Sequence, residues 1–468
     1  MRRAQSSDRG EPPPDHGHGT ACPFSTATGA SLDRRGPSGT GRRRAIMACG
    51  GSDMTVDVRT RLDRDVREYS RDEILDRLLP DAITVHGELA ARGIRYLELP
   101  PLGLEVDGRS VALAADAGRL ALRGDTESAG VVVTLAADAL SDLVQDRQSA
   151  MGLAMTSRAK IMAGNISDWI AWEPVLRALL DGRKVHEAGD VTFVDLEGDE
   201  LDLGRVFTID DNRGEMAHFL GQAGFLHLRG VFEPSEMDAL GADIDEWLTR
   251  ATPDDGESWW ATDQDGVEQP VRVLFFYEKS AVLRRLVGDA RFRWLCDLTG
   301  DGHVHTGNGE GLLKPLGIVR GLSDLPWHKD CGQGMHSYRC NGLTCGLSVT
   351  GADRTSGALG VIPGSHRANT MAAGRDPRLD LRPRLLETET GDVTVHCSDT
   401  LHRAYPPVER PRKVTYSGFG LPPRAGDVDR RDLVNTRSQR AALSDVQSRI
   451  EAADNEANPD RYRPGRGR

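Results

Sequence analysis

Apolar residues recur at helical spacing in the first patterned stretch of the chain, which begins near Ser70. Ser70 and Glu73 form a Ser-x-x-Glu capping box, a pattern that typically opens a helix. The apolar positions after it are Ile74, Leu75, Leu78, Leu79 and Ile83. Their spacing places them on one face of a helix, so we expect a helix here that packs against a core.

Short alternating runs follow this helix at residues 103–106, 110–114 and 119–123. Asp107-Gly108 and Ala117-Gly118 separate them, and such pairs are typical of tight β-hairpin turns. Further along, the pattern predicts a buried strand at 131–135, a helix near 139–144, a strand at 158–164, and a helix over 166–180 bent at Pro174. We therefore expect an α+β domain over residues 55–185.

The second half of the chain has a different pattern. Residues 186–204 belong to a polar, acidic stretch that reads as a linker with one short strand. In the domain expected at 205–430, residues 216–223 are helical, 225–229 form a strand, and a helix opens at Pro234. Short strands and glycine-rich turns from 271 to 420 indicate an antiparallel, mainly β double-stranded barrel with flanking helices.

The two ends of the chain are polar. Residues 1–54 hold almost no large apolar side chains, so we expect a disordered tail, with Met47 or Met54 as alternative starts. A nucleic-acid-binding arm is the competing interpretation of its arginines. Residues 431–468 are expected to form a charged helix and a polar tail.

Composition narrows the function classes. A formal charge of −12 argues against a nucleic-acid-binding body, and no apolar run is long enough for a transmembrane helix. The N-terminus lacks the apolar core of a secretory signal. Seven scattered cysteines fit reduced thiols in a cytoplasm better than a disulfide framework.

The strongest chemical signal is Leu325–Asp330, which contains His328-x-Asp330. Two residues apart on a strand, the imidazole and the carboxylate would leave the same face. With His402, which follows the apolar strand after Gly391-Asp392, they supply the two histidines and one carboxylate of a non-haem iron(II) site. A His-x-Asp pattern alone is weak evidence for a metal site, because it also occurs by chance. The neighbouring segments provide the stronger evidence.

Four segments in order resemble the phytanoyl-CoA dioxygenase family of iron(II)- and 2-oxoglutarate-dependent enzymes. They are Gly224–Pro234, Pro326–Asp330, Ser356–Arg367 and Gly391–His402, and the resemblance spans roughly residues 206–425. It implies a double-stranded β-helix of the jelly-roll or cupin type, with iron(II), 2-oxoglutarate and O2 as reactants and ascorbate as a supporting reductant. The reaction implied is hydroxylation of an unactivated C–H of a small molecule, with release of succinate and CO2.

The resemblance also assigns a second role. Arg412, ten residues beyond His402, is expected to bind the distal carboxylate of 2-oxoglutarate, with Arg410 as the alternative. Asp330 favours hydroxylation, since related halogenases carry a small residue at that position. Ala404 stands where many members have a small hydroxyl residue, which puts one secondary cosubstrate contact in doubt.

The N-terminal domain resembles the sterol-carrier-protein-type lipid-binding fold, most closely over Val131–Leu180. This resemblance implies an apolar tunnel and motivates the hypothesis of a lipid-like or acyl substrate. Trp169 and Trp172 are candidates to line that tunnel, although core packing is the more common role of such residues.

Other interpretations remain open at this point. His303 and His305 are the best rival metal pair, as in cupin-type enzymes that use another metal without 2-oxoglutarate. A lipid carrier with a non-catalytic barrel is a further alternative. Near the ligands, His396, Asp399 and His336 are candidates to orient them. A zinc site formed by Cys331, Cys340, Cys345 and His336 is a further alternative. The spacing of these cysteines lacks a Cys-x2-Cys knuckle, which is typical of zinc sites.

Overall fold

The structure is a computed structural model that describes residues 67–422, apart from 254, 299, 301, 322–324, 332–341, 375 and 377. The predicted N-terminal tail and the predicted C-terminal helix and tail lie outside the described residues. All described residues belong to one compact unit. No helix in the described part of the chain is long and apolar enough to cross a membrane.

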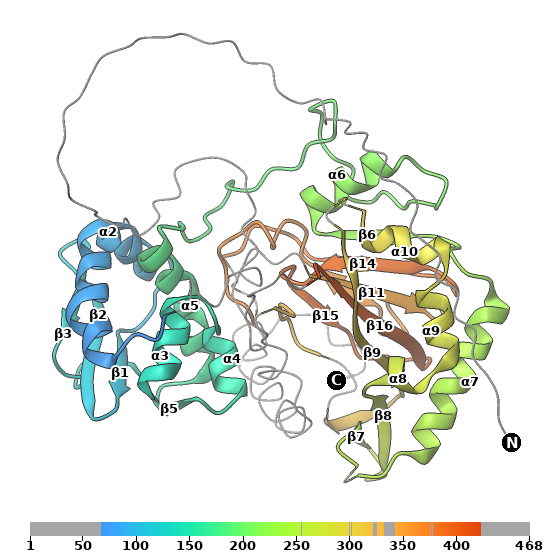
Figure 1. The fold of residues 1–468 in the computed structure, drawn as a ribbon, viewed down its shortest axis with the longest axis horizontal. Helices are drawn as coiled ribbons and strands as arrows, with labels where there is room; N and C mark the ends of the chain where they lie inside the picture. The colour runs from blue at the N-terminus through green and yellow to red at the C-terminus, as the bar shows by residue number, and fades with distance from the viewer. Residues whose placement is uncertain are drawn as a thin grey trace, which may run out of the picture. The chain divides into compact units, whose positions relative to one another are not determined.

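The N-terminal module, residues 67–186, is built on a five-stranded sheet with the order β3-β2-β1-β4-β5 (Figure 1). Only the β1–β4 pair is parallel. Its elements are α1 (Arg71–Glu73), the π-helical turn η3 (Ile74–Leu78), α2 (Leu79–Leu97), β1 (Leu102–Val106), β2 (Arg109–Asp116), β3 (Arg119–Arg123), β4 (Val131–Leu135), α3 (Ala137–Val144), α4 (Ala150–Met155), β5 (Ala159–Ala163) and α5 (Ile166–Asp181). The strands and helices predicted for this region are therefore confirmed as elements.

Local sequence signals account for the ends of these elements. The Ser70 hydroxyl accepts a hydrogen bond from the amide of Glu73 at 3.2 Å, which is one half of the predicted capping box. Asp107 and Gly108 both have positive φ, 44° and 81°, in the β1–β2 turn. Two successive positive φ angles are the requirement of a type I′ hairpin, which explains why a glycine stands second.

Trp169 and Trp172 are both completely buried in the core of this module. Their indole N–H groups donate to the carbonyls of Ala150 and Pro100, so both polar atoms are satisfied. These two tryptophans are packed core residues.

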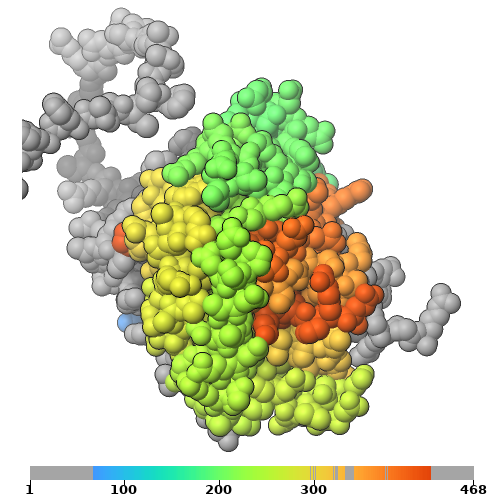
Figure 2. All heavy atoms as spheres, turned by 90° about the vertical axis from the view of Figure 1, so that its right-hand side faces the viewer, coloured from blue at the N-terminus to red at the C-terminus, as the bar shows by residue number. Residues whose placement is uncertain are grey.

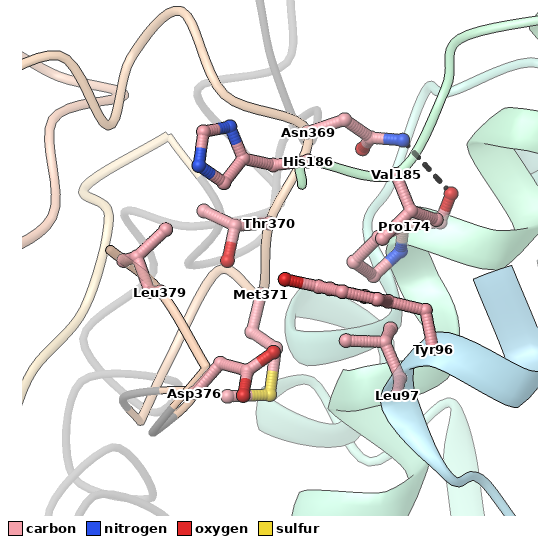
Figure 3. Close-up of a pocket in the computed structure, with 10 residues that line it drawn as sticks. All are labelled: Tyr96, Leu97, Pro174, Val185, His186, Asn369, Thr370, Met371, Asp376 and Leu379. Carbon is pink, nitrogen blue, oxygen red and sulfur yellow. Dashed lines mark hydrogen bonds between the residues drawn. The ribbon is translucent and has the colours of Figure 1, made fainter. Parts of the chain in front are cut away.

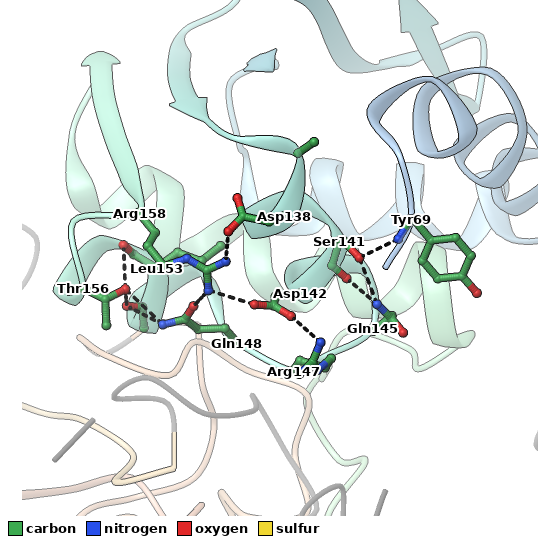
Figure 4. Close-up of polar contacts among 12 residues, drawn as sticks. Tyr69, Asp138, Ser141, Asp142, Gln145, Arg147, Gln148, Leu153, Thr156 and Arg158 are labelled. Atoms are coloured by element: carbon green, nitrogen blue, oxygen red, sulfur yellow. Dashed lines mark hydrogen bonds and ion pairs between the residues drawn. The ribbon is translucent and has the colours of Figure 1, made fainter. Parts of the chain in front are cut away.

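A polar cluster ties α3, α4 and β5 together at one side of the module (Figure 4). Arg158 donates to Asp142 at 2.8 Å, to Asp138 at 2.9 Å, and to Gln148. Asp142 also pairs with Arg147 at 3.0 Å. Because these groups lie at the ends of short helices, the cluster fixes how the helices join the sheet.

The second part of the described chain is a sandwich of two antiparallel sheets, as predicted. The large sheet has the order β10-β7-β8-β9-β16-β11-β14-β6, and the small sheet has the order β13-β12-β15. The elements are α6 (Arg213–Ala223), β6 (Phe225–Leu228), α7 (Pro234–Arg250), β7 (Ser258–Asp263), β8 (Glu268–Val273), α8 (Phe276–Lys279), α9 (Ala281–Val287), α10 (Ala290–Cys296), β9 (Val304–Lys314), β10 (Ile318–Gly321), β11 (Leu343–Ser348), β12 (Leu359–Val361), β13 (Arg384–Leu386), β14 (Val393–Cys397), β15 (His402–Ala404) and β16 (Arg412–Gly420).

The two faces of the large sheet differ in character. One face packs its apolar side chains against α6, α7, α9 and α10, and Figure 2 shows α7 lying across this side. Residues that oppose each other in a ladder point to the same side of the sheet. Thr344 opposes His396, and Arg412 opposes Lys314, so these polar side chains share the other face, toward the small sheet.

The strand predicted to carry His328 and Asp330 is not formed. Residues 325–330 form no regular strand, and His328 makes only isolated bridges, with His402 on one side and Ala373 on the other. The proline at 326 has no amide hydrogen to donate, which limits pairing along this segment. The predicted linker contains one bridge, between Val194 and Glu200, where a short strand was expected.

Candidate metal centre

The small sheet and the segment beside it bring His328, Asp330 and His402 together. The Nε2 atoms of His328 and His402 each lie 3.5 Å from Asp330 Oδ1. Nitrogen and oxygen atoms of the three side chains lie within 4.8 Å of one another, and no other such group is found among the described residues. Two imidazoles and one carboxylate on one side of an ion form the donor set of a non-haem iron(II) site.

Both imidazoles are oriented by the main chain. Nδ1 of His328 lies 2.7 Å from the Pro326 carbonyl, and Nδ1 of His402 lies 3.0 Å from the Thr400 carbonyl. A carbonyl can only accept, so each Nδ1 carries the hydrogen and each Nε2 keeps its lone pair. The lone pairs face Asp330, which is the arrangement that a metal-binding imidazole needs.

Asp330 is held through its second oxygen. The Thr344 hydroxyl donates to Oδ2 at 2.8 Å, and Nε2 of His396 lies 3.4 Å from the same atom. Burial alone would raise the pKa of Asp330, but the imidazoles of His402, His328 and His396 outweigh it and hold the pKa well below its usual range. The carboxylate is therefore ionised, with Oδ1 directed at the two histidines.

Burial disfavours the charged form of the His402 imidazole, which lies beside Asp330. It lowers the pKa of His402 well below its usual range, and the neighbouring rings of His396 and His328 add to this effect. A neutral imidazole is the form that binds a metal ion. The three side chains thus fit iron(II) in charge, tautomer and direction.

Arg412 opens β16 and is 4% exposed. Its guanidinium donates to the Gly357 carbonyl at 2.8 Å and lies 3.5 Å from the Tyr416 hydroxyl, so it shares a face with Tyr416 as predicted. Lys314, which sequence reasoning missed, opposes Arg412 in the ladder and is completely buried. Its ammonium donates to the Tyr405 carbonyl at 2.5 Å.

The structure separates the other candidates from this group. Arg410 is exposed and pairs with Asp353 at 2.6 Å, away from the inner face. The His305 ring packs between Tyr277 and Phe419, and burial lowers its pKa to about 4. Asp399 is buried. His336 and Cys340 lie outside the described residues, so the zinc hypothesis and the role of His336 stay predictions.

Sequence comparison connects the same region to known proteins. The model of the phytanoyl-CoA dioxygenase (PhyH) family matches residues 220–412. The ectoine dioxygenase of Bordetella bronchiseptica is 29% identical over 173 residues, which are 36% of this chain and 54% of that protein. The ectoine dioxygenase of Bordetella parapertussis is 28% identical over the same shares. The chain therefore spans about half the length of these curated relatives.

Several solved structures are also similar to part of this chain, at lower identity. AviO1 from Streptomyces viridochromogenes has a TM-score of 0.36 at 22% identity, covering 45% of this chain and 96% of that one. EctD from S. alaskensis with 2-oxoglutarate and 5-hydroxyectoine has a TM-score of 0.39 at 18% identity, covering 53% and 93%. The epimerase SnoN from nogalamycin biosynthesis has a TM-score of 0.38 at 19% identity, covering 44% and 82%.

The segment that matches the family model thus contains His328, Asp330, His402, Lys314 and Arg412. The donor set of the three gathered side chains, together with this match, supports iron(II) and 2-oxoglutarate as the cofactors. Residues 220–412 are thus similar to the phytanoyl-CoA dioxygenase family.

Proposed function

We propose that the protein is an iron(II)- and 2-oxoglutarate-dependent dioxygenase that hydroxylates an unactivated C–H of a small molecule. The observation that carries this proposal is the convergence of two Nε2 lone pairs on Asp330 Oδ1, at 3.5 Å each. His328, Asp330 and His402 would hold the iron on one side only. When bound, iron(II) with 2-oxoglutarate supplies O2 activation, coupled to the decarboxylation of 2-oxoglutarate to succinate.

Arg412 is proposed to bind the distal carboxylate of 2-oxoglutarate. It is buried, and its guanidinium contacts two neutral oxygens, the Gly357 carbonyl and the Tyr416 hydroxyl. Lys314 stands opposite it in the ladder, so two buried cations lie on neighbouring strands of one face. The guanidinium fork also suits a planar carboxylate.

Hydroxylation is preferred over halogenation because Asp330 fills the position of the third protein ligand. Its carboxylate is ionised and oriented by Thr344, so it is available to the metal. The lipid-like substrate stays a prediction that rests on the N-terminal module. To test this prediction, the full chain would be incubated with a lipid extract and the retained lipids identified by mass spectrometry. If the chain retains no lipid, the prediction of a lipid-like substrate is wrong.

The proposed function is tested by succinate formation. The purified full chain would be incubated with iron(II), ascorbate, O2 and 2-oxoglutarate beside the variant His328→Ala. We expect succinate from the wild type alone, because 2-oxoglutarate turnover commonly runs at a low rate without the true substrate. If the wild type forms none and also fails to bind 2-oxoglutarate by calorimetry with iron under nitrogen, the proposal is wrong and a carrier role gains support.

A further inference from the structure

Residues 369–374, which we call the strap, lie between the N-terminal module and residues 325–330. We call residues 325–330 the ligand segment, because they carry the predicted ligands His328 and Asp330. Figure 3 shows the first part of the strap, with Asn369, Thr370 and Met371, facing Pro174 and Val185 of the module. Asn369 begins the strap, and this residue is 6% exposed. One end of the strap contacts the N-terminal module and the other end contacts the ligand segment. The strap therefore connects two regions that lie far apart in the sequence.

The first end is attached to the module by the side chain and main chain of Asn369. Its amide group donates to the carbonyls of Pro174 and Arg183, at 2.9 and 2.8 Å. Its own carbonyl accepts from the amide of His186 at 3.0 Å. Both side-chain N–H groups are thus bonded to main-chain oxygens in or just after α5. Leaving a buried carbonyl unpaired is costly, because the group loses its hydrogen bond to water without gaining another.

The second end is attached to the ligand segment. The Ala372 carbonyl accepts from the amide of Lys329 at 2.7 Å, and the amide of Gly374 donates to the Trp327 carbonyl at 2.8 Å. Lys329 is the residue between the two predicted ligands. On its other edge, His328 exchanges two main-chain hydrogen bonds of 3.0 Å with His402. The ligand segment is therefore held between β15 and the strap.

Apolar packing joins the strap to the module as well. Ala372 and Ala373 are 1% and 3% exposed, and they belong to the same apolar cluster as Trp169 and Trp172. Met371 packs against that cluster from a partly buried position. A close-packed core transmits displacements of its members, because it contains few voids that could absorb them. The strap thus belongs to an apolar cluster that contains the module's core together with barrel residues such as Trp259 and Ala261.

We infer that Asn369 is a positioning residue, through which the N-terminal module fixes the main chain that carries His328 and Asp330. The inference rests on the proposed function, in that it takes these two residues as metal ligands. Its physical content is that the ligand segment, which forms no regular strand, depends on the strap for one of its two edges. The module is then part of the scaffold of the metal centre.

Replacement of Asn369 by alanine tests this inference. Asn369→Ala removes both side-chain bonds to α5 and its end, so the strap gains freedom and the ligand segment with it. Changes to the groups that orient metal ligands commonly weaken metal binding by about 10–100-fold. Asn369 contacts the strap and not the ligands themselves, so we expect the lower end of this range, a loss of about tenfold in metal affinity.

Asn165→Ala is the matched control. Asn165 caps the other end of α5, where its side chain accepts from the amide of Asp168 at 2.9 Å. Loss of an N-cap lowers the stability of the helix, because one amide at its start loses its partner. This variant weakens the same helix by the same chemical change but leaves the strap contacts in place. We expect its metal affinity to equal that of the wild type.

The experiment measures Co(II) binding by calorimetry on the full chain for the wild type, Asn369→Ala, Asn165→Ala and His328→Ala. Hydrogen exchange of the Lys329 amide is followed in the same proteins without metal. We expect weaker Co(II) binding and faster exchange of the Lys329 amide in Asn369→Ala. We expect Asn165→Ala to match the wild type in both measurements. Equal affinity and equal exchange in the wild type and Asn369→Ala would overturn the inference and leave the proposed function intact.

The two ideas fail in different ways. If the wild type and His328→Ala bind Co(II) equally, the metal centre itself is wrong, and the exchange rate of Lys329 still reports whether the strap holds the segment. Asn369→Ser, which keeps one shorter donor, replaces the alanine variant if that variant does not fold. Wild-type affinity and wild-type exchange in a folded Asn369→Ser protein would also count against the inference.

Discussion

Thr344 provides a sharp test of how the carboxylate of the site is held. Its hydroxyl donates to Asp330 Oδ2 at 2.8 Å, while Asp330 Oδ1 faces the two imidazoles. Valine has nearly the same shape as threonine but cannot donate. Thr344→Val therefore removes one hydrogen bond and leaves the packing of β11 almost unchanged.

The size of the effect follows from the charge of the acceptor. A hydrogen bond to a charged group contributes about 1.5–3 kcal/mol. The Asp330 side chain is 30% exposed, so water partly replaces the lost donor and the lower end of that range applies. A change of about 1.4 kcal/mol corresponds to tenfold in a binding constant. We expect Co(II) or iron(II) to bind about tenfold more weakly in Thr344→Val.

Thr415→Val is the matched control, because the hydroxyl of Thr415 is buried and has no hydrogen-bond partner within the described part of the chain. Calorimetric titration with Co(II) should show weaker binding for Thr344→Val and unchanged binding for Thr415→Val. The reasoning is refuted if both variants bind like the wild type while His328→Ala does not bind. The orientation of Asp330 would then be set without Thr344.

Two further predictions concern the cosubstrate and the N-terminal module. Arg412→Met should weaken 2-oxoglutarate binding at least tenfold by calorimetry with iron under nitrogen, because a carboxylate loses its charged donor; Arg410→Met is the control, and equal effects of the two would reassign the role. Burial raises the pKa of Glu173 from 4.5 to about 7, despite its ion pair with Arg177. A carboxyl group whose pKa is raised by folding binds its proton more tightly in the folded state, so stability falls as the pH rises from about 4.5 to 7. Urea unfolding should show a decline of roughly 3 kcal/mol over this range that is absent in Glu173→Gln, and equal pH profiles would contradict the assignment.

Local features of the fold could be predicted from the sequence because neighbouring residues decide them. The Ser70 cap depends on a contact three residues away, and the Asp107-Gly108 turn depends on two backbone conformations. The metal-site triad was also found in the sequence, because the spacing of His328 and Asp330 and the segments around them form a pattern. The structure brings these three side chains together.

Tertiary structure decided what surrounds the triad. The contact of Thr344 with Asp330 and the placement of Lys314 opposite Arg412 depend on strand register, which joins residues that lie far apart in the sequence. The ligand segment forms isolated bridges in place of a regular strand, and its second edge comes from the strap. The strap in turn is bound by α5 through Asn369, 195 residues beyond Pro174. The sequence by itself therefore indicated the candidate ligands and determined the local turns, whereas packing between distant segments determined which groups contact those side chains.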